Sequence, residues 1–389
     1  MKRIFSLILC AVMLLTVGCA ADTPAKKDEV IKELTAWDVA KEMGLGISLG
    51  NTMEAYDASN CDKIYYEWIP TIGDNTPEDY ETCWGAVPTT QKVIDGMRDC
   101  GFNTVRIPVF WGNMMENDGT WTINKDYIKR IKEIVDYCEK AGVYSVINIH
   151  HFDEFIIRRN DLESCKEIFT TLWTQIADYF KDYPHTVVFE GYNEYLGGSQ
   201  FNENGDLVDQ GDPKAYLMTN VLNQAFVDAV RATGGNNADR VLVVSGYWTN
   251  IDKTTSDQFV MPTDTVKDKL MVSVHYVDNA MYWGKRIGTQ QWLDYIDDQC
   301  GRLKRAFTDK GIPVFLGECA AGYPDENIGS DAIHKESSEC LEIIISEIVD
   351  YGFVPVIWDV NDNFYSRTEF KIKDEANAKV VEKILKKLK

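Results

Sequence analysis

Two glutamates in this chain each lie at the end of a short apolar run. Glu194 ends the segment VVFEGYNE and Glu318 lies in PVFLGEC. Most acidic residues that follow a strand are solvated loop residues, so either glutamate alone would carry little information. Two carboxyl groups at one site can act as a pair, in which one donates a proton to a leaving group and the other attacks or activates water. This pairing suits hydrolysis of a glycosidic bond, provided that the fold brings the two groups together.

Short apolar or β-branched runs alternate with longer segments of helical period along the chain. We expect eight of these runs to form strands: residues 44–51, 103–109, 144–151, 187–194, 240–246, 270–276, 313–319 and 353–360. The segments between them are amphipathic, and in the clearest one, residues 124–142, Gly142 is expected to end the helix. Apolar strands separated by helices indicate a parallel sheet that is covered on its outer side. Eight such units predict an α/β fold with a single (β/α)8 TIM barrel.

An open, doubly wound sheet is the alternative architecture. A glycine-rich phosphate loop would be expected after its first strand, and GLGISLGN at residues 44–51 lacks the GxGxxG spacing. The weakest unit of the barrel is residues 247–269, which have little helical period and are expected to form a short or irregular helix. The length of 389 residues is compatible with one barrel domain.

The barrel prediction places both glutamates at one mouth, because active sites of this fold lie at the C-terminal ends of the strands. Glu194 ends the fourth predicted strand and Glu318 ends the seventh. Other side chains that can form hydrogen bonds or stack on a ligand end strands at the same rim: Arg106, His150, His151, His275 and Trp358. A basic group beside one carboxyl group, and burial of the other, would separate the two pKa values.

The N-terminal residues have the pattern of an export signal. Lys2 and Arg3 precede an apolar run that is short for a membrane span, and this run ends at a small residue followed by Cys19. That ending resembles the lipobox of bacterial lipoproteins, although Thr16 stands where Leu is commoner. We predict a signal peptide over residues 1–18, lipidation of Cys19, a tether and the start of the N-terminal helix over residues 19–35, and a catalytic domain over residues 36–389. The protein is expected to be exported, as a cell-surface lipoprotein or a secreted protein.

The charge balance limits the expected partners. The chain has 61 acidic and 40 basic residues and a formal net charge of −21. Such a surface repels nucleic acid and anionic lipid, so no nucleic-acid partner is expected and membrane contact would be made only through a lipid anchor at Cys19. The same charge could also serve solubility alone. We expect a monomer that acts on a neutral substrate.

The ten cysteines argue against a metal or redox centre. No CxxC pair is present, which disfavours a zinc ribbon or a thioredoxin-type site. A metal-dependent barrel hydrolase would usually have an HxH pair on an early strand, whereas the adjacent histidines here are His150 and His151. We therefore expect neither a metal nor a cofactor. The disulfide pairing stays open, with Cys61 and Cys83 as the favoured bridge.

Seven segments of the chain, taken in order, resemble the family 5 glycoside hydrolases, the cellulase-like clan with catalytic glutamates on strands four and seven. They are GISLGNTMEA, GFNTVRIPVFW, INIHH, FEGYNE, VSVHY, VFLGE and VIWDVND. Each motif alone is weak, but seven in register with eight strands are specific, and they span about residues 36–365. The resemblance implies a retaining double displacement in which Glu194 is the general acid/base and Glu318 the nucleophile.

The resemblance also implies roles for the residues around the two glutamates. Asn193 would bind the 2-hydroxyl group of the sugar being cleaved, and Arg106 would hold Glu318 ionised and oriented. Trp358 would form the surface on which a pyranose ring stacks. Further hydrogen bonds to the sugar and the glutamates would come from His150 and His275, and from His151 in the neighbouring subsite.

Two positions depart from the family pattern. Many members have a tyrosine two residues after the strand-six histidine, where this chain has Val277, so Tyr276 or Tyr282 is expected to replace it near the nucleophile. Tyr195 follows the Asn-Glu pair where proline is frequent, which is expected to alter the loop rather than the chemistry.

Aromatic residues gather in the loops expected to follow the strands: Tyr56, Tyr65, Tyr66, Trp68, Trp84, Trp111, Trp121, Trp248, Tyr282 and Trp283. A row of aromatic side chains along a cleft is suited to a neutral polysaccharide. Together with the long segments 52–88 and 277–289, they favour an open groove and endo-acting cleavage of a plant-type β-glucan. The prediction is an endo-β-1,4-glucanase acting on cellulose-type, mixed-linkage or xyloglucan-type chains. The alternatives are a mannan- or xylan-directed hydrolase of the same clan and a non-catalytic surface glycan-binding protein, which would be expected to lack one glutamate.

Overall fold

The computed structural model describes residues 34–57, 71–195, 197–276, 289–319 and 337–389. Residues Leu34–Lys389 form one compact unit. The predicted signal peptide, Cys19 and most of the predicted tether lie outside the described residues, as do Cys61, Val277, Tyr282 and Trp283.

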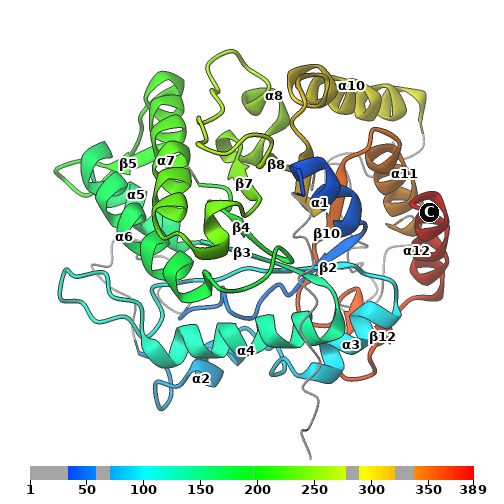
Figure 1. The fold of residues 1–389 in the computed structure, drawn as a ribbon, viewed down its shortest axis with the longest axis horizontal. Coiled ribbons are helices and arrows are strands. Elements are labelled where there is room, and N and C mark those ends of the chain that lie inside the picture. Colours follow the sequence, from blue (N-terminus) through cyan, green and yellow to red (C-terminus); the bar gives the residue numbers. More distant parts are fainter. Residues whose placement is uncertain (1–33, 58–70, 196, 277–288, 320–336) are drawn as a thin grey trace, which may run out of the picture. The chain divides into compact units, whose positions relative to one another are not determined.

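Eight parallel strands close into a barrel in the order β1-β10-β9-β8-β7-β4-β3-β2 (Figure 1). Their bounds are β1 Gly46–Ser48, β2 Thr104–Ile107, β3 Tyr144–Asn148, β4 Val187–Glu190, β7 Leu242–Ser245, β8 Leu270–Tyr276, β9 Val314–Cys319 and β10 Val354–Ile357. Each lies within one of the eight predicted runs. The first strand pairs with both β2 and β10, which confirms the closed barrel and excludes the open sheet.

Helices surround the strands (Figure 1). They are α1 Ala36–Met43, α2 Pro77–Thr82, α3 Gln91–Asp99, α4 Lys125–Ala141, α5 Phe152–Arg159, α6 Leu162–Phe180, α7 Asp212–Ala232, α8 Ile251–Thr254, α10 Gln290–Ala306, α11 Ser337–Asp350 and α12 Glu375–Lys387. The α4 helix ends at Gly142, which has a φ of 75° as predicted. After β7 the chain forms only a 3-10 turn, η3 (Tyr247–Thr249), and α8, as expected for the weakest unit. Within the part of the chain that is described, no helix combines the length and apolar character needed to cross a membrane.

Two short hairpins were not predicted. They are formed by β5 (Ser199–Phe201) with β6 (Leu207–Asp209), and by β11 (Tyr365–Ser366) with β12 (Lys371–Ile372). Strands this short lack the alternating run on which a prediction from sequence depends.

The strand residues alternate between two buried clusters. Residues such as Ile47, Val105 and Leu316 pack against the helices. The inward-facing residues of the other set, among them Val146, Val188, Val243, Phe315 and Val356, fill the barrel together with the apolar face of α1. The next inward positions, toward the C-terminal ends, are polar and buried: Arg106, Asn148, Glu190, Ser273, His275 and Glu318. The barrel interior therefore changes from apolar to charged along the same strands.

A bulge in β9 sets the direction of Glu318. Val274 of β8 pairs with Leu316, but the next residue, His275, pairs with Glu318, so Gly317 is the extra residue. Strict alternation from the outward-facing Leu316 would have turned Glu318 toward the helices. The extra residue restores its inward direction, which is a frequent use of bulges near active sites.

Candidate active site

Arg106 on β2 connects three side chains at the mouth of the barrel. Its Nε donates to Glu190 Oε2 at 2.7 Å, its Nη1 to Glu318 Oε1 at 2.9 Å and its Nη2 to Asn193 Oδ1 at 2.9 Å. The Arg106 side chain is fully buried. Burial disfavours the charged guanidinium, but Glu190 and Glu318 outweigh it and raise the pKa of Arg106. The guanidinium is therefore a fixed positive charge beside Glu318.

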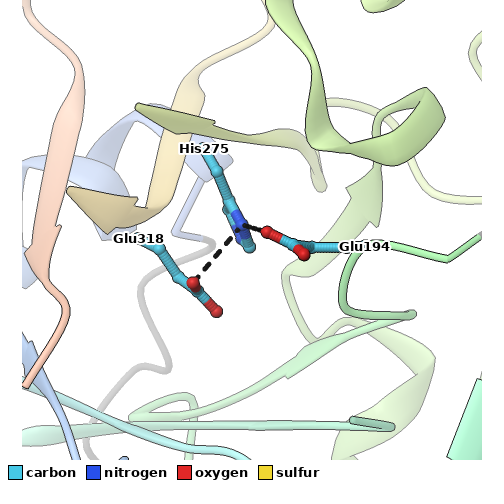
Figure 2. Close-up of side chains that lie close together, drawn as sticks. All are labelled: Glu194, His275 and Glu318. Carbon is cyan, nitrogen blue, oxygen red and sulfur yellow. Dashed lines mark hydrogen bonds and ion pairs between the residues drawn. The ribbon is translucent and has the colours of Figure 1, made fainter. Parts of the chain in front are cut away.

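The two predicted glutamates meet on either side of His275 (Figure 2). His275 Nδ1 lies 2.8 Å from Glu194 Oε1 and 3.6 Å from Glu318 Oε2. One oxygen of each carboxylate and a ring nitrogen of His275 all lie within 4.8 Å of one another. The side chain of Glu318 is 8% exposed, whereas that of Glu194 is 52% exposed. One carboxyl group is thus buried on a strand while the other faces the open side of the mouth.

The backbone after β4 carries Asn193 and Glu194 to this position. β4 ends at Glu190, four residues earlier than the predicted run. Gly191 N then bonds to Val243 O, and Tyr192 N bonds to Ser245 Oγ, so the segment is fixed to the end of β7. The buried Tyr192 hydroxyl also donates to Leu222 O of α7. These contacts hold Asn193 at the guanidinium of Arg106.

The pKa of Glu194 is lowered, whereas the pKa values of Glu318 and His275 are raised. Burial acts to raise the pKa of Glu194, but the hydrogen bond and charge of His275, together with the charges of Arg106 and His151, outweigh it and the net shift is downward. Burial raises the pKa of Glu318, against the lowering by His275 and Arg106. Burial favours neutral His275, yet Glu318 and Glu194 together raise its pKa. In the free site the shared proton is therefore held mainly by His275, next to Glu194.

The other predicted residues line the same mouth. His150 is 2% exposed, and its ring stacks parallel to that of Trp358 at 5.8 Å between centroids. Burial lowers the pKa of His150 well below its usual range, so it is a neutral hydrogen-bonding group. His151 adopts a φ of 59° at the start of α5, and burial lowers its pKa to about 4. Tyr276 ends β8 and lines a pocket with Glu194 and His275.

The sequence interpretation missed three residues beneath the pair. Glu190 Oε2 accepts from Asn148 Nδ2 at 3.1 Å, and Glu190 Oε1 accepts from Ser273 Oγ at 2.7 Å. Glu190 lies inside the FEGYNE segment, and the apolar residues before it predict only a buried strand. A charged residue within an otherwise apolar strand is unusual, and this is the signal in the sequence that could have identified Glu190 as part of the site. Its side chain faces into the barrel, as that of Arg106 does.

Trp248 is the most accessible of the described aromatic residues near the glutamates. Its side chain is 45% exposed and its backbone has a φ of 51°. It lines two adjoining pockets that share Glu194, the larger with a volume of about 390 Å³. Trp111, which was also expected in the cleft, is instead fully buried and donates from Nε1 to Asn148 O. That part of the cleft prediction was wrong, because the loop after β2 folds back into the core.

Glu194, His275 and Glu318 are also close enough to act as metal ligands. A resident cation would, however, lie against the buried guanidinium of Arg106, 2.9 Å from Glu318, and against a histidine that its neighbours favour in the charged form. The electrostatics of these residues fit proton transfer better than cation binding. Of the predicted bridge, Cys83 has a free thiol 3.6 Å from Tyr56 O, and Cys61 lies outside the described residues.

A barrel that carries two close carboxyl groups, a buried arginine and a half-buried tryptophan at its C-terminal mouth is typical of retaining glycoside hydrolases. Comparison with known proteins identifies the family. Residues 70–364 match the model of the cellulases, glycosyl hydrolase family 5. The chain belongs to this family and is a glycoside hydrolase of the endoglucanase type.

The relatives are similar over most of the chain. Endoglucanase B of Neocallimastix patriciarum is 33% identical over 336 residues, which cover 85% of this chain and 66% of that enzyme. A broad-specificity endoglucanase of Ruminococcus champanellensis with bound cellotriose superimposes with a TM-score of 0.75 at 29% identity, covering 90% of this chain and 99% of that one. A Bacteroides ovatus xyloglucanase in complex with a heptasaccharide gives 0.76 at 26% identity, covering 92% and 78%.

Proposed function

We propose that this protein cleaves internal β-1,4-glucosidic bonds by a retaining double displacement, with Glu318 as the nucleophile and Glu194 as the general acid/base. The observation that carries the proposal is the closeness of the two carboxylates, whose oxygens lie within 4.8 Å. Retaining enzymes have carboxyl groups about 5–5.5 Å apart, whereas inverting enzymes leave about 6.5–9.5 Å for a water molecule. The spacing supports direct attack on the sugar.

The first step needs a protonated Glu194 and an ionised Glu318. Arg106 stabilises the ionised Glu318 through the bond from Nη1, and His275 Nδ1, the nitrogen that carries the proton to be transferred, lies 2.8 Å from Glu194 Oε1. When a sugar covers Glu194 and excludes water, transfer of that proton gives neutral His275 and a protonated acid without changing the net charge of the site. Glu318 attacks C1 while Glu194 donates to the leaving oxygen. In the second step Glu194 takes a proton from a water molecule whose oxygen bonds to C1, and the ester bond between C1 and Glu318 breaks with its electron pair on the Glu318 oxygen.

The surrounding residues support binding of a pyranose next to this pair. Trp358 is half-buried and stacked on His150, an arrangement that presents one flat ring to the mouth. Asn193, held by Arg106, is placed for a hydroxyl group beside the reacting carbon. We propose that the substrate is bound on both sides of the cleaved bond by six side chains: Trp358, His150, His151, Asn193, His275 and Tyr276.

The proposed substrates are cellulose-type, mixed-linkage and xyloglucan-type β-glucans. The names of the relatives support this range, since one is described as having broad specificity and another as a xyloglucanase. Product analysis on carboxymethylcellulose, barley β-glucan, xyloglucan, xylan and glucomannan tests it. Oligosaccharide release from the first three supports the proposal, while release from xylan or glucomannan alone would favour the alternative.

Two variants test the roles of the glutamates. Glu318→Ala should reduce turnover by at least about 10⁴-fold, and azide should restore it with formation of a glycosyl azide of the opposite anomeric configuration. Glu194→Ala should keep measurable activity on aryl glycosides with good leaving groups, which need no proton donor in the first step. The reverse pattern would mean that the two roles are exchanged.

We also propose that the protein is exported and lipidated at Cys19, and that it is a monomer. The apolar run and the small residue before Cys19 support lipidation. Lipidation is tested by expressing the wild type and Cys19→Ala in a bacterium fed labelled palmitate; the variant should lose the label and the membrane association together. Label retained in Cys19→Ala would contradict the proposal.

The oligomeric state is measured by light scattering of the protein without its first 18 residues.

A further inference from the structure

Glu190 is a buried carboxylate beneath the proposed catalytic pair that the mechanism so far does not use. Its side chain is fully buried on β4. It accepts hydrogen bonds from side chains of three other strands: Arg106 Nε at 2.7 Å, Ser273 Oγ at 2.7 Å and Asn148 Nδ2 at 3.1 Å. A buried ion with this many charge-assisted and neutral bonds has one fixed position.

The bond to Glu190 sets the direction of the whole guanidinium of Arg106. The donors of a guanidinium lie in one rigid plane, so fixing Nε also fixes the directions of Nη1 and Nη2. These two nitrogens point to Glu318 and Asn193, at 2.9 Å each. The orientation of the nucleophile therefore depends on an anion that does not itself face the substrate mouth.

Glycine at position 317 leaves room for this arrangement. A methyl group there would lie 3.0 Å from Glu190 Oε1, 3.1 Å from Ser273 Oγ and 3.2 Å from His275 Nε2. Gly317 is also the bulge residue that turns Glu318 inward. The bulge residue Gly317 therefore lies directly against the side chains that hold Glu190, beneath the nucleophile.

We propose that Glu190 is a positioning residue for hydrolysis, which orients Arg106 toward Glu318 and remains its anionic partner when Glu318 becomes an ester. This inference rests on the proposed function. In the first step a Glu318 oxygen forms a bond to C1, the C1–O bond breaks with its electron pair on the leaving oxygen, and that oxygen takes the proton of Glu194. Glu318 is then uncharged, and without Glu190 the buried Arg106 would have no carboxylate hydrogen-bonded to it, which is strongly unfavourable.

Because Glu190 and Glu318 share the guanidinium of Arg106, we expect the charge of Glu190 to influence the ionisation of Glu318. The charged groups that act on Glu318 are His275 from β8, Arg106 from β2 and Glu194 from the loop after β4. Glu190 of β4 and the neutral His150 after β3 interact with the same Arg106. Replacing Glu190 by glutamine removes one negative charge and leaves Arg106 with Glu318 as its only carboxylate. Both changes favour ionised Glu318, so the acidic limb of the pH profile of kcat/KM should move to lower pH.

The test compares Glu190→Gln with Glu81→Gln. Glu81 is a matched control, because it is also fully buried and bound to an arginine, Arg130 Nε at 2.9 Å, but lies in α2. Each variant is assayed on an aryl cellobioside for its pH profile, kcat, KM and melting temperature. Glu190→Gln should lower kcat/KM by about 100-fold, mostly in kcat, and move the acidic limb down by about one pH unit. Glu81→Gln should lower the melting temperature and leave the profile in place.

A folded Glu190→Gln enzyme with the wild-type profile and kcat would overturn the inference. If that variant does not fold, Glu190→Asp serves instead, because it keeps the charge but withdraws it from Arg106 Nε by one methylene group. It should lose about tenfold in kcat, and wild-type kinetics would again overturn the inference. Glu318→Ala, assayed beside them, separates the two proposals: an active Glu318→Ala would refute the proposed function itself, whereas an inactive one with a wild-type Glu190→Gln refutes only the role of Glu190.

Discussion

The two ends of the barrel interior are made by the same strands and differ in almost every physical property. At the N-terminal end, inward residues such as Val188, Val243 and Phe315 pack with Met43 of α1 in an apolar cluster. At the C-terminal end, the next inward residues include Arg106, Glu190 and Glu318, which are equally buried but ionisable. The first end gains free energy from burial, while the second holds charges whose desolvation costs free energy. Stability and chemistry are thus separated along the strands, by two or three residues.

The largest effect on stability is expected from Met43→Ala at the apolar end. Met43 is fully buried, and its truncation should lower the free energy of unfolding by about 2–5 kcal/mol. Denaturant unfolding measures this change. The kcat of the folded variant, measured well below its melting temperature, should stay within about twofold of the wild type. A large loss of kcat would show that the two ends are coupled.

The matching change at the charged end is Trp358→Ala. Trp358 is only half-buried, so its loss should leave the melting temperature nearly unchanged. If it is the surface under the sugar, kcat/KM should fall by about 30- to 1,000-fold, or about 2–4 kcal/mol of transition-state binding. Activity and melting should be measured on the same preparation. A variant with full activity and a much lower melting temperature would assign Trp358 to the core.

The buried carboxylates near the mouth predict how stability depends on pH. Burial raises the pKa of Glu54, in the loop after β1, and of Asp359, after β10, to about 7 in each case. Because these folded-state pKa values exceed the unfolded ones, the folded state binds more protons, and stability is lost as the pH rises from about 4.5 through 7.

The free energy of unfolding should therefore be lower at pH 8 than at pH 5 by on the order of 2–3 kcal/mol for Glu54 alone. Glu54→Gln should reduce that difference, whereas Met43→Ala should lower stability by the same amount at both pH values. An unchanged pH difference in Glu54→Gln would mean that Glu54 is ionised in the folded protein at pH 5.

The smallest effect compares two exposed tryptophans, one at each end. Trp248 lines both pockets beside Glu194, while Trp37 lies on α1 and donates to Gly311 O. Trp248→Ala should reduce kcat/KM on cello-oligosaccharides by about fivefold, or about 1 kcal/mol, and have little effect on an aryl cellobioside, whose leaving group is small. Trp37→Ala should change neither. Equal losses on both substrates would place Trp248 in the support of Glu194 rather than in sugar binding.

Local sequence patterns determined the eight strands, most of the long helices and the positions of Glu194 and Glu318. Apolar period and helix-ending glycines act over a few residues, so they can be read directly, and strand ends of a barrel must meet at one mouth. The resemblance of seven motifs to a family added the expected neighbours of the glutamates.

Only the tertiary structure decided which buried charged and polar side chains are paired with one another. The three nitrogens of the Arg106 guanidinium bond to Glu190, Glu318 and Asn193. They can do so because closure of the barrel brings β2, β4 and β9 together. The bulge at Gly317 depends on pairing across β8 and β9, and no local pattern specifies that register. Trp111 and Trp248 are both tryptophans in loops after strands, yet one is buried in the core and the other is exposed beside Glu194, because loop packing involves residues far apart in the chain.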